Sequence, residues 1–134
     1  MEKRNIKIPL IIMKKSGSKE GKRLYHNIIK TLLEKDIPYI IYTEKSFILC
    51  YNNSTYNINK ISEVVKIIDA CIVIESDYSK DVVEVVDSLL SIGKDILCFP
   101  SNIYNINGYF SNNLIRDGAF CLTSEYMLIE YLSS

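Results

Sequence analysis

The chain has 134 residues, of which 48% are hydrophobic and 24% charged, and its formal net charge is zero. This composition excludes a disordered module, and the length fits a single domain, which we expect to span residues 1–134. No apolar run approaches the roughly 20 residues that a membrane helix requires, so we expect no membrane contact.

The first half of the chain alternates between strand-like and helix-like segments. An apolar, β-branched run at 6–13 predicts a buried strand. Leucines and isoleucines at helical spacing predict an amphipathic helix at 19–35. The run 39–42 predicts a second strand, and 47–51 predicts a hairpin arm that returns beside it. Residues 52–59 are rich in Asn, Ser and Thr, which favours a polar loop.

The second half continues the alternation. Isoleucines and valines predict a short helix at 61–68, and the unbroken apolar run 70–74 predicts a central strand. Residues 79–92 predict a helix that ends at Gly93, and 96–99 predict the next strand. The remaining expected elements are a helix at 112–117, an edge strand at 120–122 and a helix at 124–132. This order predicts an α/β fold, a single Rossmann-like three-layer domain with a mostly parallel sheet of four to six strands and helices on both faces.

Four short motifs in the second half carry the strongest signal. They are Ile72-Val73-Ile74-Glu75-Ser76, Gly93-Lys94, Phe99-Pro100-Ser101 and Asn112-Asn113-Leu114-Ile115-Arg116-Asp117-Gly118-Ala119. In this order and spacing they resemble the C-terminal part of the Rossmann-like domain of the DprA/Smf family, DNA-processing proteins that handle incoming single-stranded DNA. The resemblance implies a DNA-processing role and a homodimer that forms through the terminal third of the chain.

The chain departs from the family pattern where the family binds its ligand. The family's Ser-Gly and Thr-Ala, on the helix after the central strand, fall on Lys80-Asp81 and Val85-Val86. Small residues at a helix start let backbone N–H groups close on an anion, whereas this sequence places a carboxylate and bulky side chains there. We therefore expect a non-catalytic binding or assembly module, not an enzyme, without a cofactor or a metal site.

A crevice at the carboxyl ends of the strands is the expected ligand site, because α/β proteins bind ligands there. The candidate residues are Glu75, Ser76, Lys80, Pro100, Ser101 and Asn112. An alternative function is therefore a sensor or sponge for a nucleotide-like small molecule. Glu75 and Asp77 have the chemistry to bind Mg²⁺, but a role for Glu75 in capping a helix or bonding loop backbone is favoured, since no third ligand is evident.

Positive charge is concentrated in the first third of the chain. Residues 1–35 hold ten Lys and Arg against three acids, and residues 36–134 hold six against thirteen. Such a split predicts a basic face for an anionic partner or a self-complementary interface, unless folding interleaves the two halves. The candidate contacts with single-stranded DNA, bound weakly, or with a protein partner are Lys14, Lys15, Lys19, Lys22, Arg23, Lys60 and Arg116.

The segment 16–23 lies between a predicted strand and a predicted helix, where a phosphate loop would lie. It lacks the first glycine and the metal-binding hydroxyl of a P-loop, so we do not expect ATP hydrolysis. A looser contact between an anion and Ser18, Lys19 and Lys22 is one interpretation, and a solvated turn is the other.

Four cysteines are spread along the chain without a C-x-x-C pair: Cys50, Cys71, Cys98 and Cys121. Each lies in an apolar run, which predicts buried thiols in a reducing compartment. The N-terminal residues 1–4 lead into an apolar run without a signal-peptide cleavage site. Both observations favour the cytoplasm.

Overall fold

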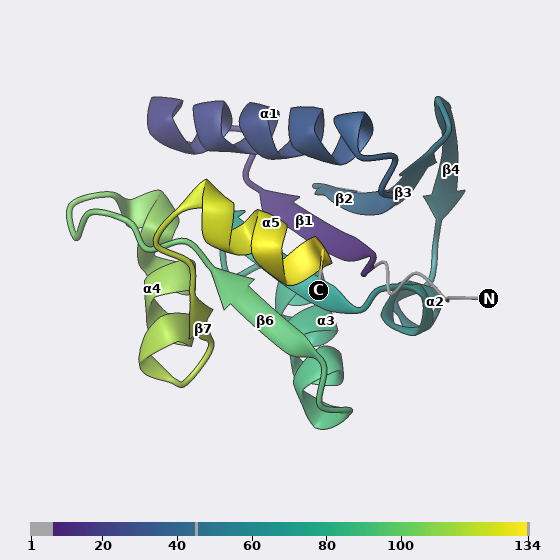
Figure 1. Ribbon diagram of the computed structural model, residues 1–134. Helices are drawn as coiled ribbons and strands as arrows, with labels where there is room; N and C mark the ends of the chain where they lie inside the picture. The colour runs from purple at the N-terminus through teal and green to yellow at the C-terminus, as the bar shows by residue number, and fades with distance from the viewer. Residues whose placement is uncertain (1–6, 45, 134) are drawn as a thin grey trace.

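The computed structural model describes residues 7–44 and 46–133, and these form one seven-stranded sheet with helices packed on it (Figure 1). The elements are β1 (Pro9–Met13), α1 (Lys19–Glu34), β2 (Tyr39–Thr43), β3 (Ser46–Tyr51), β4 (Ser54–Ile58), α2 (Ile61–Ile67), β5 (Ala70–Glu75), α3 (Lys80–Ser91), β6 (Asp95–Cys98), a 3₁₀ turn η1 (Ile106–Gly108), α4 (Tyr109–Arg116), β7 (Phe120–Cys121) and α5 (Glu125–Ser133). The α/β class and the mostly parallel sheet are confirmed. The expected count of four to six strands is wrong.

Two expectations concern the start of the chain. The first strand begins at Pro9, and residue 6 of the predicted run lies outside the described residues. Residues 1–4, which were considered for a signal peptide, also lie outside them. Each helix in the described part of the chain is too short or too polar to cross a bilayer.

The strand order is β4-β3-β2-β1-β5-β6-β7. The strands β2, β1, β5, β6 and β7 run parallel, and the β3–β4 hairpin extends the sheet beyond β2 with two antiparallel strands. Counted alone, the parallel strands have the order 2-1-3-4-5, which is common among doubly wound α/β proteins. The order reverses between β1 and β5. Their carboxyl ends therefore form the topological switch point, where such folds bind ligands.

Helices cover both faces of the sheet (Figure 1). On one face, Leu32 of α1 and Leu128 of α5 pack with Ile72 of β5. On the other face, helices α2, α3 and α4 contribute to a second core, in which Val85 packs with Val73. Successive side chains of a strand point to opposite faces, so the central strand β5 is buried on both sides. This explains its unbroken apolar sequence.

The expected polar loop at 52–59 is wrong, because β4 occupies most of it. Asn52 and Asn53 have φ angles of 50° and 62°, which suits a two-residue hairpin turn of type I′. Thr55 and Tyr56 then continue as strand, as residues of β-branched and aromatic type favour. The amide-rich composition therefore marks a tight turn and an exposed edge strand.

Candidate functional site

The carboxyl end of β5 at the switch point is formed by Glu75, whose side chain is buried and 2% exposed. Its Oε1 accepts the backbone N–H of Ser18 at 2.7 Å, and its Oε2 accepts the hydroxyl of Ser18 at 2.5 Å. The amide of Asn105 donates to Oε2 at 2.7 Å. Ser18 is the N-cap of α1, so the carboxylate lies at the positive end of that helix dipole. Of the two roles expected for Glu75, capping a helix or bonding loop backbone, the structure shows the second: Glu75 accepts the backbone N–H of Ser18, and the hydroxyl of Ser18 itself caps α1.

Two glycines leave the space that this carboxylate occupies. A Cβ atom on Gly17 would lie 2.5 Å from Oε1 of Glu75, and one on Gly21 would lie 2.6 Å from its Cδ. The glycines of the segment 16–23 therefore allow close approach of an anion, but the anion is a side chain of the same protein. Ser18 was one candidate for contact with an external anion, with a solvated turn as the other interpretation, and in the structure it bonds to this internal carboxylate.

A second set of polar contacts joins the ends of β1 and β5 to the loop before α4. The Nζ of Lys14 donates to Oδ1 of Asp77 at 2.8 Å and to Oδ1 of Asn107 at 3.1 Å. The backbone N–H of Ser76 donates to the carbonyl of Asn107 at 3.1 Å. Together with the Glu75 contacts, these bonds fix residues 102–108 over the switch point.

One cavity, here named the β1/β2 cavity, lies between α1 and the carboxyl ends of β1 and β2 and has a volume of about 770 Å³. Its charged and aromatic lining residues are Lys14, Lys15, Lys22, Tyr25, His26, Tyr42, Glu44 and Asp77. Lysines outnumber carboxylates around it, and two tyrosine rings contribute apolar surface. Partial burial raises the pKa of Tyr25 above its ordinary value of 10.0, so this phenol stays neutral at physiological pH. The cavity suits a ligand that combines negative charge with a flat ring.

A second cavity, the β5/β6 cavity, has a volume of about 620 Å³ and lies on the other side of the start of α1. Its lining includes Glu20, Glu75, Tyr104 and Asn105. Among the described residues that line it there is no Lys or Arg, so its charge is acidic. The linings of the two cavities therefore carry charge of opposite sign, and the cavities lie on either side of the first turn of α1.

Three of the six candidate crevice residues line the β5/β6 cavity: Glu75, Pro100 and Ser101. Asn112 does not line the cavity but holds Ser101 in place by two hydrogen bonds. The Oδ1 of Asn112 accepts the backbone N–H of Ser101 at 2.9 Å, and the Nδ2 of Asn112 donates to the carbonyl of Ser101 at 3.0 Å. Ser76 is buried, and its hydroxyl donates to the carbonyl of Asp77. Lys80 is exposed at the start of α3 and is not among the described residues that line either cavity.

The start of α3, where the family pattern would place an anion, is capped by a side chain of the same helix. The hydroxyl of Ser79 accepts the backbone N–H of Val82 at 3.3 Å. Val82 and Val86 are buried in the core, and Asp81 is exposed. Lys80 and Asp81 thus lie on the surface, while the valines fill the space beneath the helix.

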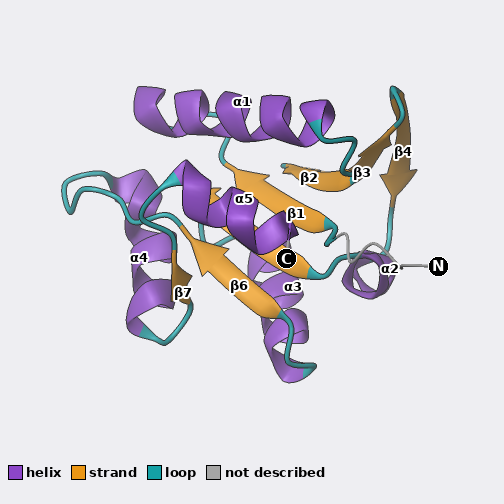
Figure 2. Cartoon of the chain, in the orientation of Figure 1, coloured by secondary structure: helices purple, strands orange, loops and turns teal. Residues whose placement is uncertain are grey.

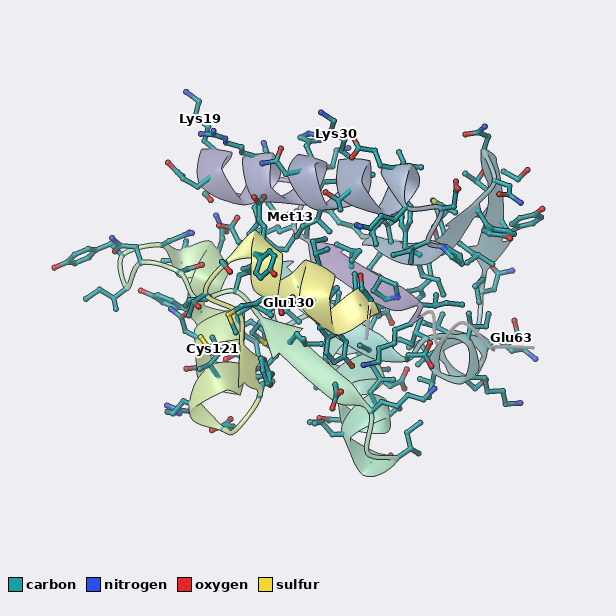
Figure 3. All side chains as sticks on the ribbon, viewed as in Figure 1. Met13, Lys19, Lys30, Glu63, Cys121 and Glu130 are labelled. Atoms are coloured by element: carbon teal, nitrogen blue, oxygen red, sulfur yellow. The ribbon has the colours of Figure 1, made fainter. Side chains whose placement is uncertain are left out.

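The seven basic candidates divide into three groups. Lys14, Lys15 and Lys22 line the β1/β2 cavity, and Lys19 and Arg23 are exposed on α1. Figure 3 shows Lys19 pointing away from the sheet on the outer side of α1, as does Lys30 further along the helix. Lys60 precedes α2 on the opposite face, and Arg116 at the end of α4 pairs with Asp117 at 3.4 Å. The first five of these candidates therefore belong to α1 and the segment just before it, which Lys60 and Arg116 do not.

Sequence reasoning missed the aromatic and imidazole lining of the β1/β2 cavity. Tyr25 and His26 follow Lys22 at positions three and four residues later, which is one face of a helix. That spacing is a usable signal. Tyr42 comes from the end of β2, and only the sheet order brings it to the same cavity.

Within the described chain, no three His, Cys, Asp or Glu side chains gather in a way that would hold a metal ion. No protein-family model matches the chain, and no curated protein matches it.

Proposed function

We propose that this domain is a non-catalytic binding module that holds a nucleotide-like phosphate ligand in the β1/β2 cavity. The observation that carries the proposal is the gathering of Lys14, Lys15 and Lys22 around one cavity beside the switch point. Its volume of about 770 Å³ falls in the range of small-molecule sites. The acidic β5/β6 cavity offers no such cationic lining.

The chemistry of the cavity assigns separate parts of the ligand to separate side chains. Lys15 and Lys22 are exposed, and their ammonium groups are available to phosphate oxygens. Lys14 is bonded to Asp77, so it adds less net positive charge. Tyr25 and Tyr42 line the same cavity, and we expect a base to stack on one of these rings. A nucleotide satisfies both requirements.

The described carboxylates at the switch point are already engaged within the protein, which supports binding rather than catalysis. Glu75 accepts three hydrogen bonds, and the carboxylate of Asp77 is paired with Lys14. His26 is exposed on α1, and in the described structure no carboxylate bonds to its ring. A general base needs such an orienting partner to act on a nucleophile.

The resemblance to the DprA/Smf family supports a role in DNA processing, in which the same phosphate chemistry comes from single-stranded DNA. Lys19 and Arg23 are exposed on α1 and add positive charge beyond the cavity lining. The four cysteines are free thiols, which supports a cytoplasmic location. The resemblance also implies self-association, which does not depend on a ligand in the cavity.

Calorimetric titration with mononucleotides and with a 5′-phosphorylated oligo(dT) tests the proposal and separates the two sources of phosphate. We expect binding that Lys22→Ala weakens at least tenfold and that Lys30→Ala, which removes an equal charge from α1 outside the cavity, leaves within twofold. Mononucleotide binding indicates a small-molecule sensor. Binding of the oligonucleotide alone, with a steep salt dependence, indicates DNA. No heat with either ligand at 50 mM salt, or equal loss in both variants, overturns the cavity assignment.

A further inference from the structure

The strand β4 forms an open edge of the sheet. It pairs with β3 on one side, and none of the other described strands pairs with its outer side. Figure 2 shows β4 as the outermost strand at the rim of the molecule. Four of its five residues, Ser54 to Asn57, are exposed.

The hairpin turn decides which backbone groups face outward. In a β-turn the carbonyl of the first residue accepts the N–H of the fourth, so Tyr51 and Ser54 bond to each other across the Asn52-Asn53 turn. Inward and outward groups alternate along an antiparallel strand. Thr55 and Asn57 therefore direct their N–H and C=O groups away from β3.

Nothing in β4 blocks pairing with another strand. Protected edges carry charged residues, proline or a bulge, or are very short. Residues 46–59 contain no charge and no proline, and β3 and β4 pair in regular register. The opposite edge of the sheet, β7, is only two residues long and is protected by its brevity.

We propose that two copies of this chain join edge to edge through β4, antiparallel about a two-fold axis, so that their sheets become continuous. An identical partner fits because an uncharged edge meets its own copy without repulsion. With Tyr56 on the axis, Thr55 of each copy lies opposite Asn57 of the other, and the pairs exchange four backbone hydrogen bonds. The ring of Tyr56, which is 55% exposed, then faces its own copy as a cross-strand aromatic pair.

This contact differs from the interface expected from the family resemblance, which lies in the terminal third. It also leaves the β1/β2 cavity open, because β4 is not part of its lining. Dimerisation and ligand binding can therefore be tested separately, and a result that excludes the β4 dimer does not exclude ligand binding in the cavity.

Sedimentation equilibrium of the full chain at micromolar concentrations tests the proposal. We expect a mass of twice the 15.4 kDa of the single chain. Thr55→Pro removes one outward N–H from an edge position that tolerates proline, and we expect at least tenfold weaker association. Thr55→Val keeps the N–H and the β-branched shape, so its dimer should match that of the wild type.

Tyr56→Lys provides a second test that does not alter the backbone. It places two lysines opposite each other on the axis, and we expect a monomer, whereas Tyr56→Phe should remain a dimer. A wild-type chain that is monomeric at 200 µM overturns the proposal. So does a dimer that persists in both Thr55→Pro and Tyr56→Lys but dissociates in Phe120→Lys, a result that would place the contact in the terminal third.

Discussion

Glu75 and Ser18 are joined by two hydrogen bonds at the switch point. The serine donates its backbone N–H to Oε1 of Glu75 at 2.7 Å and its hydroxyl to Oε2 at 2.5 Å. Backbone N–H groups at a helix start bind anions, including the phosphates of ligands. In this chain the anion at the start of α1 is the carboxylate of Glu75, the last residue of β5. Two exposed cations, Lys15 and Lys22, line the neighbouring β1/β2 cavity instead, which is where the proposed function would place a ligand phosphate.

Replacing Glu75 by Gln should lower the free energy of unfolding by about 2 kcal/mol, the cost of leaving buried donors without an acceptor. A glutamine turns an NH₂ group toward either Ser18 or Asn105, and Asn105 already donates to this side chain. Urea denaturation measures the change. Asp77→Asn is the matched control, because the side chain of Asp77 is 64% exposed and its pair with Lys14 should contribute about 0.5 kcal/mol. Equal effects of the two variants would contradict the structural role of Glu75.

Gly21→Ala should destabilise the protein although alanine favours a helix by about 1 kcal/mol over glycine. The new Cβ would lie 2.6 Å from the Cδ of Glu75, whose three hydrogen bonds prevent it from moving aside. In a Glu75→Ala background the clash disappears, and the same substitution should stabilise. A double-mutant cycle by urea denaturation therefore shows a change of sign. Independent, additive effects would mean that the glycine does not serve the carboxylate.

Stability should fall at alkaline pH because of two buried thiols. Burial raises the pKa of Cys98 from an ordinary 9.0 to about 12, and burial raises the pKa of Cys71 further. A thiol whose pKa is higher in the folded state contributes stability that is complete below pH 9 and is lost as the pH rises toward 12. Between pH 9 and 11 the free energy of unfolding should therefore drop by about 1 kcal/mol per pH unit for each thiol.

Urea denaturation at half-unit pH steps checks this slope. Cys98→Ala changes the absolute stability, but it should also make the decline between pH 9 and 11 shallower than that of the wild type. Cys121→Ala serves as a control, since that thiol is only partly buried. A wild-type stability that stays level from pH 8 to pH 11 would contradict the prediction.

The elements that sequence reasoning located correctly are those with a strong apolar pattern. Leu24, Ile28 and Leu32 mark the buried side of α1 at helical spacing, and the apolar run at 70–74 marks β5 as a central strand. The strand β4 was missed for a physical reason. Its first four residues are exposed, so the alternation of apolar and polar side chains that identifies a strand is absent there.

The candidate site was predictable in part. That Glu75 would bond loop backbone instead of a metal ion could be expected, because the sequence offers no third ligand beside Glu75 and Asp77. Its bond to Asn105 and the bond between Lys14 and Asn107 depend on the path of the loop 102–108, which no local pattern specifies. The β1/β2 cavity also needs the strand order, because β1 and β2 become neighbours only in the folded sheet.

The position of β1 between β2 and β5 has a consequence for biosynthesis. Leu10 is in register with Ile40 on one side and with Cys71 on the other, so the second partner leaves the ribosome about sixty residues after β1. Until then the nascent chain carries an apolar strand, β1, with one edge unpaired. Unpaired strand edges of this kind form non-native pairs with other strands. We therefore expect β1 to be exposed to mispairing during translation until residues 70–75 have been made.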